Sequence, residues 1–94
     1  IASQNYKLGQ NYPNPFNPTT KIRFELPKSS FVSLKIYNSL GKEVDELVNQ
    51  KLSAGVFEET FNASNNASVL PSGVYFYKLI TDEFVETKKM LLVK

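Results

Sequence analysis

The feature that most constrains this chain is a series of short segments in which apolar and polar side chains alternate. One of them is Thr19–Leu26, where Ile22, Phe24 and Leu26 are separated by charged residues. Phe31–Tyr37 repeats the pattern. A period of two places one face of an extended strand in the core and the other in water. No segment carries a convincing helical pattern, so an all-β fold is expected.

The segment after the glycine turn is ambiguous. Gly41 supplies the positive φ that a turn over Asn38–Lys42 needs, which predicts an antiparallel hairpin. In Glu43–Asn49 the apolar residues have the spacing of a helix: Val44, Leu47 and Val48. Because the segment is short, we interpret it as an edge strand, with a one-turn helix as the alternative.

The second half of the chain continues in the same style. Gly55–Phe61 is predicted to be a strand with Phe57 and Phe61 on one face, followed by a polar loop over Asn62–Ser68. Short strands with turn signals about every 8–12 residues indicate an antiparallel β-sandwich of about seven strands, in an Ig-like or fibronectin-like arrangement.

Two strands close the chain. Gly73–Ile80 and Phe84–Val93 are expected to pair about a turn at Thr81–Glu83. Both carry apolar residues on both faces, which is typical of strands in the middle of a sheet. The predicted core residues are Phe24, Ile36, Phe61, Tyr75 and Leu79.

Asn11–Pro18 carries three prolines, Pro13, Pro15 and Pro18. Each proline fixes its own φ and lacks an N–H donor, so the segment is excluded from helices and central strands. We expect it to lie extended along the domain, with Tyr12 and Phe16 as apolar anchors.

Composition excludes several functions. The 94 residues suit one domain, and they include no cysteine and no histidine. The chain therefore has no thiolate nucleophile, no histidine base and no cysteine zinc site. Glu58 and Glu59 are adjacent, so on a strand they point to opposite faces and cannot act as a pair. We expect no enzyme activity, no cofactor and no metal.

Other partners are also disfavoured. The net charge of +2 is too small for a nucleic-acid footprint, and no apolar run approaches the roughly 20 residues that span a bilayer. Five tyrosines would suit a platform for sugar rings, but they are spread over several strands, which favours core packing instead. The chain has no initiator Met and no signal peptide, so we interpret it as part of a longer protein.

Three blocks in order resemble the type A C-terminal sorting domains of the bacterial type IX secretion system. They are Asn11–Thr20 with its Pro-Asn-Pro motif, Leu34–Val44 with its glycine turn, and Gly73–Lys78 together with Lys88–Lys94. Asn38 and Lys42 stand where many members carry Asp and Arg, which are conservative departures.

The resemblance implies a folded secretion signal. The outer-membrane translocon would recognise the domain, and a sortase would cut upstream of it and attach the passenger to the cell surface. Residues 1–5 would end a linker from a missing passenger, and residues 6–94 would form the sorting domain. The protein would reach the surface or the medium through the periplasm of a Gram-negative-type bacterium.

Residue roles follow from the same resemblance. The recognition candidates are Gly73, Tyr75, Lys78, Lys88, Lys89 and Lys94. The structural motif residues are Pro13, Pro15, Phe16 and Gly41. Two alternatives stay open at this point: a structural Ig-like spacer and a carbohydrate-binding accessory module.

Overall fold

The computed structural model describes residues 5–64 and 70–94, and it contains seven strands. The strands are β1 (Lys7–Leu8), β2 (Thr19–Leu26), β3 (Ser30–Asn38), β4 (Glu43–Leu52), β5 (Gly55–Asn62), β6 (Gly73–Ile80) and β7 (Val85–Leu92). The predicted loop over Asn62–Ser68 lies largely outside the described residues, as does most of the expected linker over residues 1–5. Across the described part of the chain, no helix is long and apolar enough to cross a membrane.

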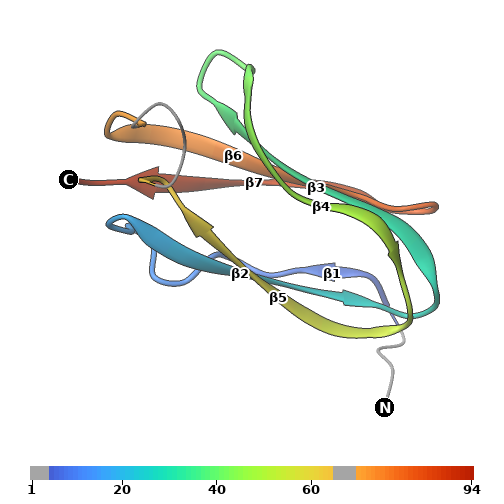
Figure 1. The fold of residues 1–94 in the computed structure, drawn as a ribbon. Coiled ribbons are helices and arrows are strands. Elements are labelled where there is room, and N and C mark those ends of the chain that lie inside the picture. Colours follow the sequence, from blue (N-terminus) through green and yellow to red (C-terminus); the bar gives the residue numbers. More distant parts are fainter. Residues whose placement is uncertain (1–4, 65–69) are drawn as a thin grey trace.

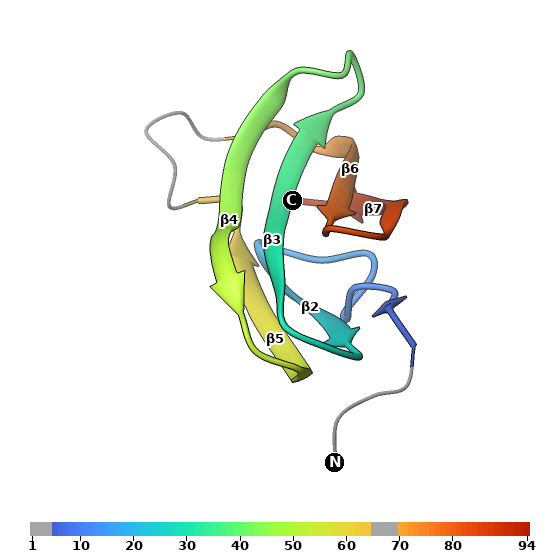
Figure 2. The ribbon, with the colours of Figure 1, turned by 90° about the vertical axis from the view of Figure 1, so that its right-hand side faces the viewer.

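Two antiparallel sheets pack face to face, which confirms the predicted sandwich (Figure 1). One sheet has the strand order β1-β2-β5 and the other has the order β4-β3-β6-β7. Residues 27–29 carry the chain from the first sheet to the second, and Ser53 and Ala54 carry it back. Turned by 90°, the sandwich shows β4 and β5 on one side and β6 and β7 on the other (Figure 2).

The core forms where the apolar faces of the alternating strands meet. Every predicted core residue is buried: Phe24, Ile36, Phe61, Tyr75 and Leu79. The alternation therefore assigned the correct inward faces to β2, β3 and β6. Cross-strand packing adds to this core, because Phe24 lies directly opposite Phe57 with ring centroids 5.4 Å apart.

The ambiguous segment is strand β4, which lies at an edge of the four-stranded sheet as predicted. Its register with β3 shifts twice. Leu47 has no partner residue on β3 at the first shift, and Val44 has none at the second. Each shift is a β-bulge that adds one residue to β4. These two extra residues explain why the apolar residues of a strand have helix-like spacing.

The closing hairpin differs from expectation in one strand. β6 lies between β3 and β7, in the middle of its sheet, as its two apolar faces predicted. The prediction of a central position was wrong for β7, which is an edge strand. Val85, Leu91 and Val93 face outward and are partly exposed. The apolar residues on this face of β7 are therefore not covered by another described part of the domain.

The proline-rich segment is ordered and packs against both sheets. Phe16 is 1% exposed, as predicted for an anchor, and its ring meets Phe61 edge-on with centroids 5.9 Å apart. The prediction for Tyr12 was wrong, because its side chain is 79% exposed. Tyr12 contributes through its backbone instead, which pairs with Lys21 of β2 through two hydrogen bonds of 2.9 Å.

Candidate recognition surface

The outward-facing side of the β6–β7 hairpin is the candidate surface. Cross-strand register places Val74 opposite Leu91, Phe76 opposite Lys89, and Lys78 opposite Thr87. We call these six residues the hairpin outer face. Their neighbours in sequence, among them Tyr75, Tyr77 and Met90, face the core instead. The face combines an exposed apolar pair, Val74 and Leu91, with two lysines.

Lys78 and Lys89 are brought together by this register. They lie on neighbouring strands one diagonal step apart, which is about 7–8 Å between backbone positions. Within residues 5–64 and 70–94, neither lysine has a carboxylate partner. The hairpin outer face is therefore positively charged.

On the adjoining strands β3 and β4, the outward-facing lysine has carboxylate partners. Lys35 on β3 lies directly opposite Lys78, but its Nζ is 3.2 Å from Glu43 and 3.9 Å from Glu46 on β4. The hydrogen bond and charge of Glu43 raise the pKa of Lys35 above its ordinary value. The positive charge of Lys35 is thus neutralised by β4 carboxylates, whereas the charges of Lys78 and Lys89 are left open.

The other two lysine candidates lie elsewhere. Lys88 faces the interior side of β7, is half-buried, and forms an ion pair with Glu86 at 3.3 Å. Lys94 is exposed beyond the end of β7. The structure therefore separates Lys88 from the pair formed by Lys78 and Lys89.

Tyr75 and Gly73 stand at the start of β6. The Tyr75 side chain is buried, and its hydroxyl donates a 2.6 Å hydrogen bond to the carbonyl of Pro71. Burial raises the pKa of this phenol. Gly73 has φ +150°, a conformation that residues with a side chain rarely adopt. These two residues shape the backbone at the start of β6. Because the Tyr75 ring is buried, a partner protein cannot contact it.

The segment Gln10–Phe16, which we call the N-terminal strap, covers the second half of β7 on the side that faces away from β6. The Phe16 N–H donates to the Leu91 carbonyl at 2.9 Å, and the Val93 N–H donates to the Phe16 carbonyl at 3.0 Å. Asn14 Oδ1 accepts from the Leu91 N–H at 3.0 Å. Pro13 and Pro15 are exposed, and because they have no N–H they leave no free donor on the outside of the strap.

A buried polar network fixes the strap to the sandwich. The Tyr77 hydroxyl donates to the Gly9 carbonyl at 2.7 Å and accepts from the Asn11 N–H at 2.8 Å. The Asn11 amide donates to Thr20 Oγ1 at 3.0 Å, and that hydroxyl donates to the Pro13 carbonyl at 2.8 Å. Burial raises the pKa of Tyr77 to about 12. Sequence reasoning missed this network, because the segments that meet in it are far apart in the chain.

Gly41 lies outside the hairpin outer face, in the turn that joins β3 and β4 (Figure 1). Its φ is +85°, as the turn prediction required. The Asn38 side chain accepts from the N–H groups of Leu40 and Lys42 at 2.9 and 3.0 Å. An Asp at this position would accept the same two bonds, so the departure to Asn preserves the turn.

The acidic and aromatic side chains outside this surface are dispersed over the domain. In the described part of the chain, no cluster of three acidic or metal-binding side chains is present. The five tyrosines do not form one exposed platform. Tyr75 and Tyr77 are buried on the inward face of β6, Tyr6 stacks on Phe84 at 5.4 Å, Tyr12 is exposed on the strap, and Tyr37 is half-buried on β3 opposite Phe76.

Comparison with known proteins shows the family of this chain. The model of the family described as the secretion system C-terminal sorting domain matches residues 10–94. No curated protein matches the chain. The solved structure of Pseudomonas fluorescens alkylpurine DNA glycosylase AlkC, bound to DNA containing an abasic site analog, matches with a TM-score of 0.52 at 15% identity. That match covers 95% of this chain but 30% of the other, and at this identity it supports the fold alone. The chain belongs to the family of C-terminal sorting domains of the type IX secretion system.

Proposed function

We propose that this domain directs an upstream passenger across the outer membrane, and that the type IX translocon recognises it through the hairpin outer face. The observation that carries the proposal is the pairing of Lys78 and Lys89 beside the exposed Val74 and Leu91. A positive, partly apolar face suits a partner surface that is acidic and partly apolar. The sorting family is not an enzyme family, and the domain acts as a signal.

The remaining recognition candidates have different proposed roles. We assign Gly73 and Tyr75 to shaping the start of β6, since Tyr75 is buried. Lys94 is exposed and accessible to the machinery, whereas Lys88 is held by Glu86. Pro13, Pro15 and Phe16 belong to the N-terminal strap and Gly41 to the β3–β4 turn, so all four act through the fold.

We further propose that a sortase removes the domain and attaches the passenger to the cell surface. Tyr6 stacks on Phe84, and β1 begins at Lys7, so the folded part is engaged from Tyr6 onward. This supports a cut on the N-terminal side of Tyr6, after the linker over residues 1–5. Mass spectrometry of the released passenger would locate the cut, and a cut after Leu8 would contradict this position.

Charge reversal tests the recognition surface. A periplasmic reporter is fused ahead of residues 1–94 in a type IX-competent host, and its export is compared between K78E/K89E and a matched K42E/K51E control. Both double variants change the net charge equally, and Lys42 and Lys51 are exposed and are not part of the hairpin outer face. We expect export to fall at least about tenfold in K78E/K89E only, which corresponds to about 1.4 kcal/mol of recognition energy. Equal export by the two variants would contradict the proposed surface.

A further inference from the structure

The outer edge of β7 carries a regular row of backbone groups. Leu91 directs both its N–H and its carbonyl away from β6, toward Asn14 and Phe16 of the strap. In an antiparallel ladder, residues whose two groups point outward alternate with residues whose groups point to the neighbouring strand. Lys89, Thr87 and Val85 therefore direct their backbone groups outward as well.

The N-terminal strap covers only part of this row. It meets Val93 and Leu91 through Phe16 and Asn14, and the Gln10 amide donates to the Lys89 carbonyl at 2.9 Å. Among the strand pairings and backbone hydrogen bonds of residues 5–64 and 70–94, none involves the outward groups of Val85 and Thr87. Val85 is also 59% exposed. We call Val85–Thr87 the open edge.

The other edge strands of the sandwich are guarded. β4 carries two bulges and several charged residues, and β1 has a length of two residues. β5 carries the adjacent carboxylates Glu58 and Glu59, of which Glu58 pairs with Lys21 of β2 at 3.7 Å. The open edge has fewer such devices, because β6 and β7 pair in unbroken register and its one charged side chain, Glu86, is ion-paired with Lys88. Proteins usually suppress unguarded edges because such edges pair with other strands.

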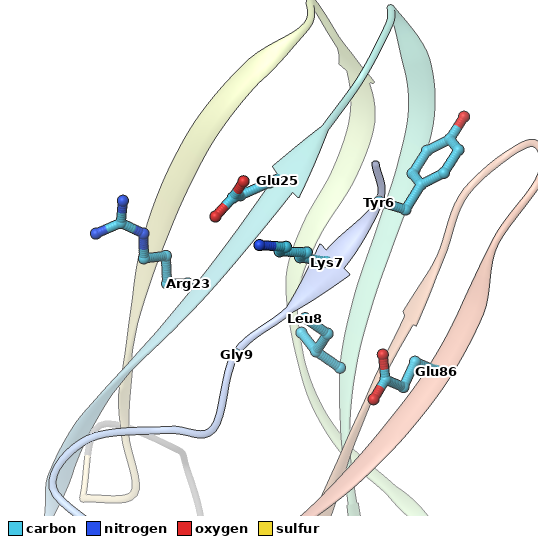
Figure 3. Close-up of a pocket in the computed structure, with 7 residues that line it drawn as sticks. All are labelled: Tyr6, Lys7, Leu8, Gly9, Arg23, Glu25 and Glu86. Carbon is cyan, nitrogen blue, oxygen red and sulfur yellow. The ribbon is translucent and has the colours of Figure 1, made fainter. Parts of the chain in front are cut away.

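A hollow lies beside the open edge, at the seam between the two sheets (Figure 3). Its volume is about 220 Å³, and Glu86 of β7 faces Leu8 and the rest of β1 across it. Lys7, Arg23 and Glu25 complete its charged rim, which balances two cations against two carboxylates. A strand that paired with β7 would direct alternate side chains toward this seam.

We infer that the open edge accepts an extended segment of the secretion machinery by strand addition, as a fifth strand beside β7. Main-chain hydrogen bonds to Val85 and Thr87 would supply affinity, and a neutral side chain seated in the hollow would supply selectivity. The inference rests on the proposed function and adds a second contact to the hairpin outer face. A second copy of this chain is disfavoured, because the short edge would be its whole interface and would bury far less than the roughly 1,000 Å² of a stable interface, whereas the machinery also contacts the hairpin outer face.

The test removes the outward donor while keeping the β6–β7 ladder. Thr87→Pro deletes an N–H that points away from β6, and an edge strand tolerates a proline at such a position. Thr87→Ala is its control, because it keeps the N–H and removes only the side chain. Val85→Pro with Val85→Ala is the second pair, because Val85 is the first residue of its strand. Export of the fused reporter in a type IX-competent host is measured beside the thermal melting of each variant. Variants that melt within about 8 °C of the wild type count as folded.

Strand addition predicts that a folded proline variant loses at least about tenfold in export while its alanine partner stays within about twofold of the wild type. Two results would overturn it: folded proline variants that export normally, or equal losses with alanine and proline. A dimer in light scattering that Thr87→Pro abolishes without changing export would assign the edge to a second copy, which also overturns the inference. Failure of the wild-type fusion to export at all would instead count against the proposed function itself.

Discussion

Phe16 and Leu91 join the proline-rich segment to the last strand of the protein. The Phe16 N–H donates to the Leu91 carbonyl at 2.9 Å while the Phe16 ring lies in the core. The two ends of the domain are therefore one structural unit. The strap protects the second half of β7 from unwanted strand pairing and fixes the position of the hairpin outer face.

Phe16→Ala is expected to lower the free energy of unfolding by about 3–5 kcal/mol, because it leaves a cavity beside Phe61. Tyr12→Ala is the matched control on the same segment, and its exposed ring predicts a change within about 0.5 kcal/mol. Urea unfolding followed by circular dichroism measures both. Similar losses for the two variants would contradict the different roles assigned to these aromatics.

Ile36→Ala is expected to lower the free energy of unfolding by about 2–5 kcal/mol, because Ile36 is buried between the sheets. Phe31→Ala on the same strand removes a larger but half-exposed side chain and should cost less. The same urea titration applies. A loss below about 0.5 kcal/mol for Ile36→Ala would contradict the inward face of β3.

Tyr77→Phe is expected to cost about 1–3 kcal/mol at neutral pH, because it leaves the Gly9 carbonyl and the Asn11 N–H without a partner. The wild type should also lose stability at high pH. Burial raises the pKa of Tyr77 from 10.0 to about 12 in the folded protein. Its contribution is therefore full below pH 10 and is lost as the pH rises toward 12, since the unfolded chain releases the proton first.

Comparison of wild type and Tyr77→Phe across this pH range isolates that contribution. The stability difference between them should shrink as the pH rises from 9 to about 11.5. Tyr75→Phe, which removes a single bond to Pro71, serves as a comparison, and its stability difference should shrink in the same direction because burial also raises the pKa of Tyr75. A difference that stays constant with pH would contradict the assigned pKa.

Removal of Met90–Lys94 separates fold from signal. The deletion takes away the buried Met90 and Leu92 and the end of the β6–β7 ladder, so it should destabilise the domain as well as abolish export. Lys94→Ala changes an exposed residue and should alter stability by no more than about 0.5 kcal/mol. If the Lys94→Ala variant is folded but its reporter stays in the periplasm, the terminal lysine has a direct role in export. Wild-type export by the deletion would refute sorting by this domain.

Much of the fold was predictable because its signals are local. The alternation around Phe24 and Ile36 identified the inward faces, and Gly41 identified a turn. The position of β4 was predicted despite its helix-like spacing, which the bulges at Val44 and Leu47 explain. The sequence did not show that β7 is an edge or that Tyr12 is exposed, because both depend on which distant strands become neighbours.

The candidate surface was predictable in part. The resemblance pointed to Lys78, Lys88, Lys89 and Lys94 together, but strand alternation and pairing place Lys78 and Lys89 on one face and Lys88 on the other. The bonds of the N-terminal strap join residues separated by more than 60 positions, such as Asn11 and Tyr77. No local pattern encodes such contacts.

The most direct test of the central claim is the fraction of reporter found outside the cell for a fusion carrying residues 1–94 behind a signal peptide. The account predicts that the reporter leaves a type IX-competent host and stays in the periplasm of a matched host lacking the translocon. Reporter retained in the periplasm of the competent host, or released equally by both hosts, would contradict the assignment of this domain as a sorting signal.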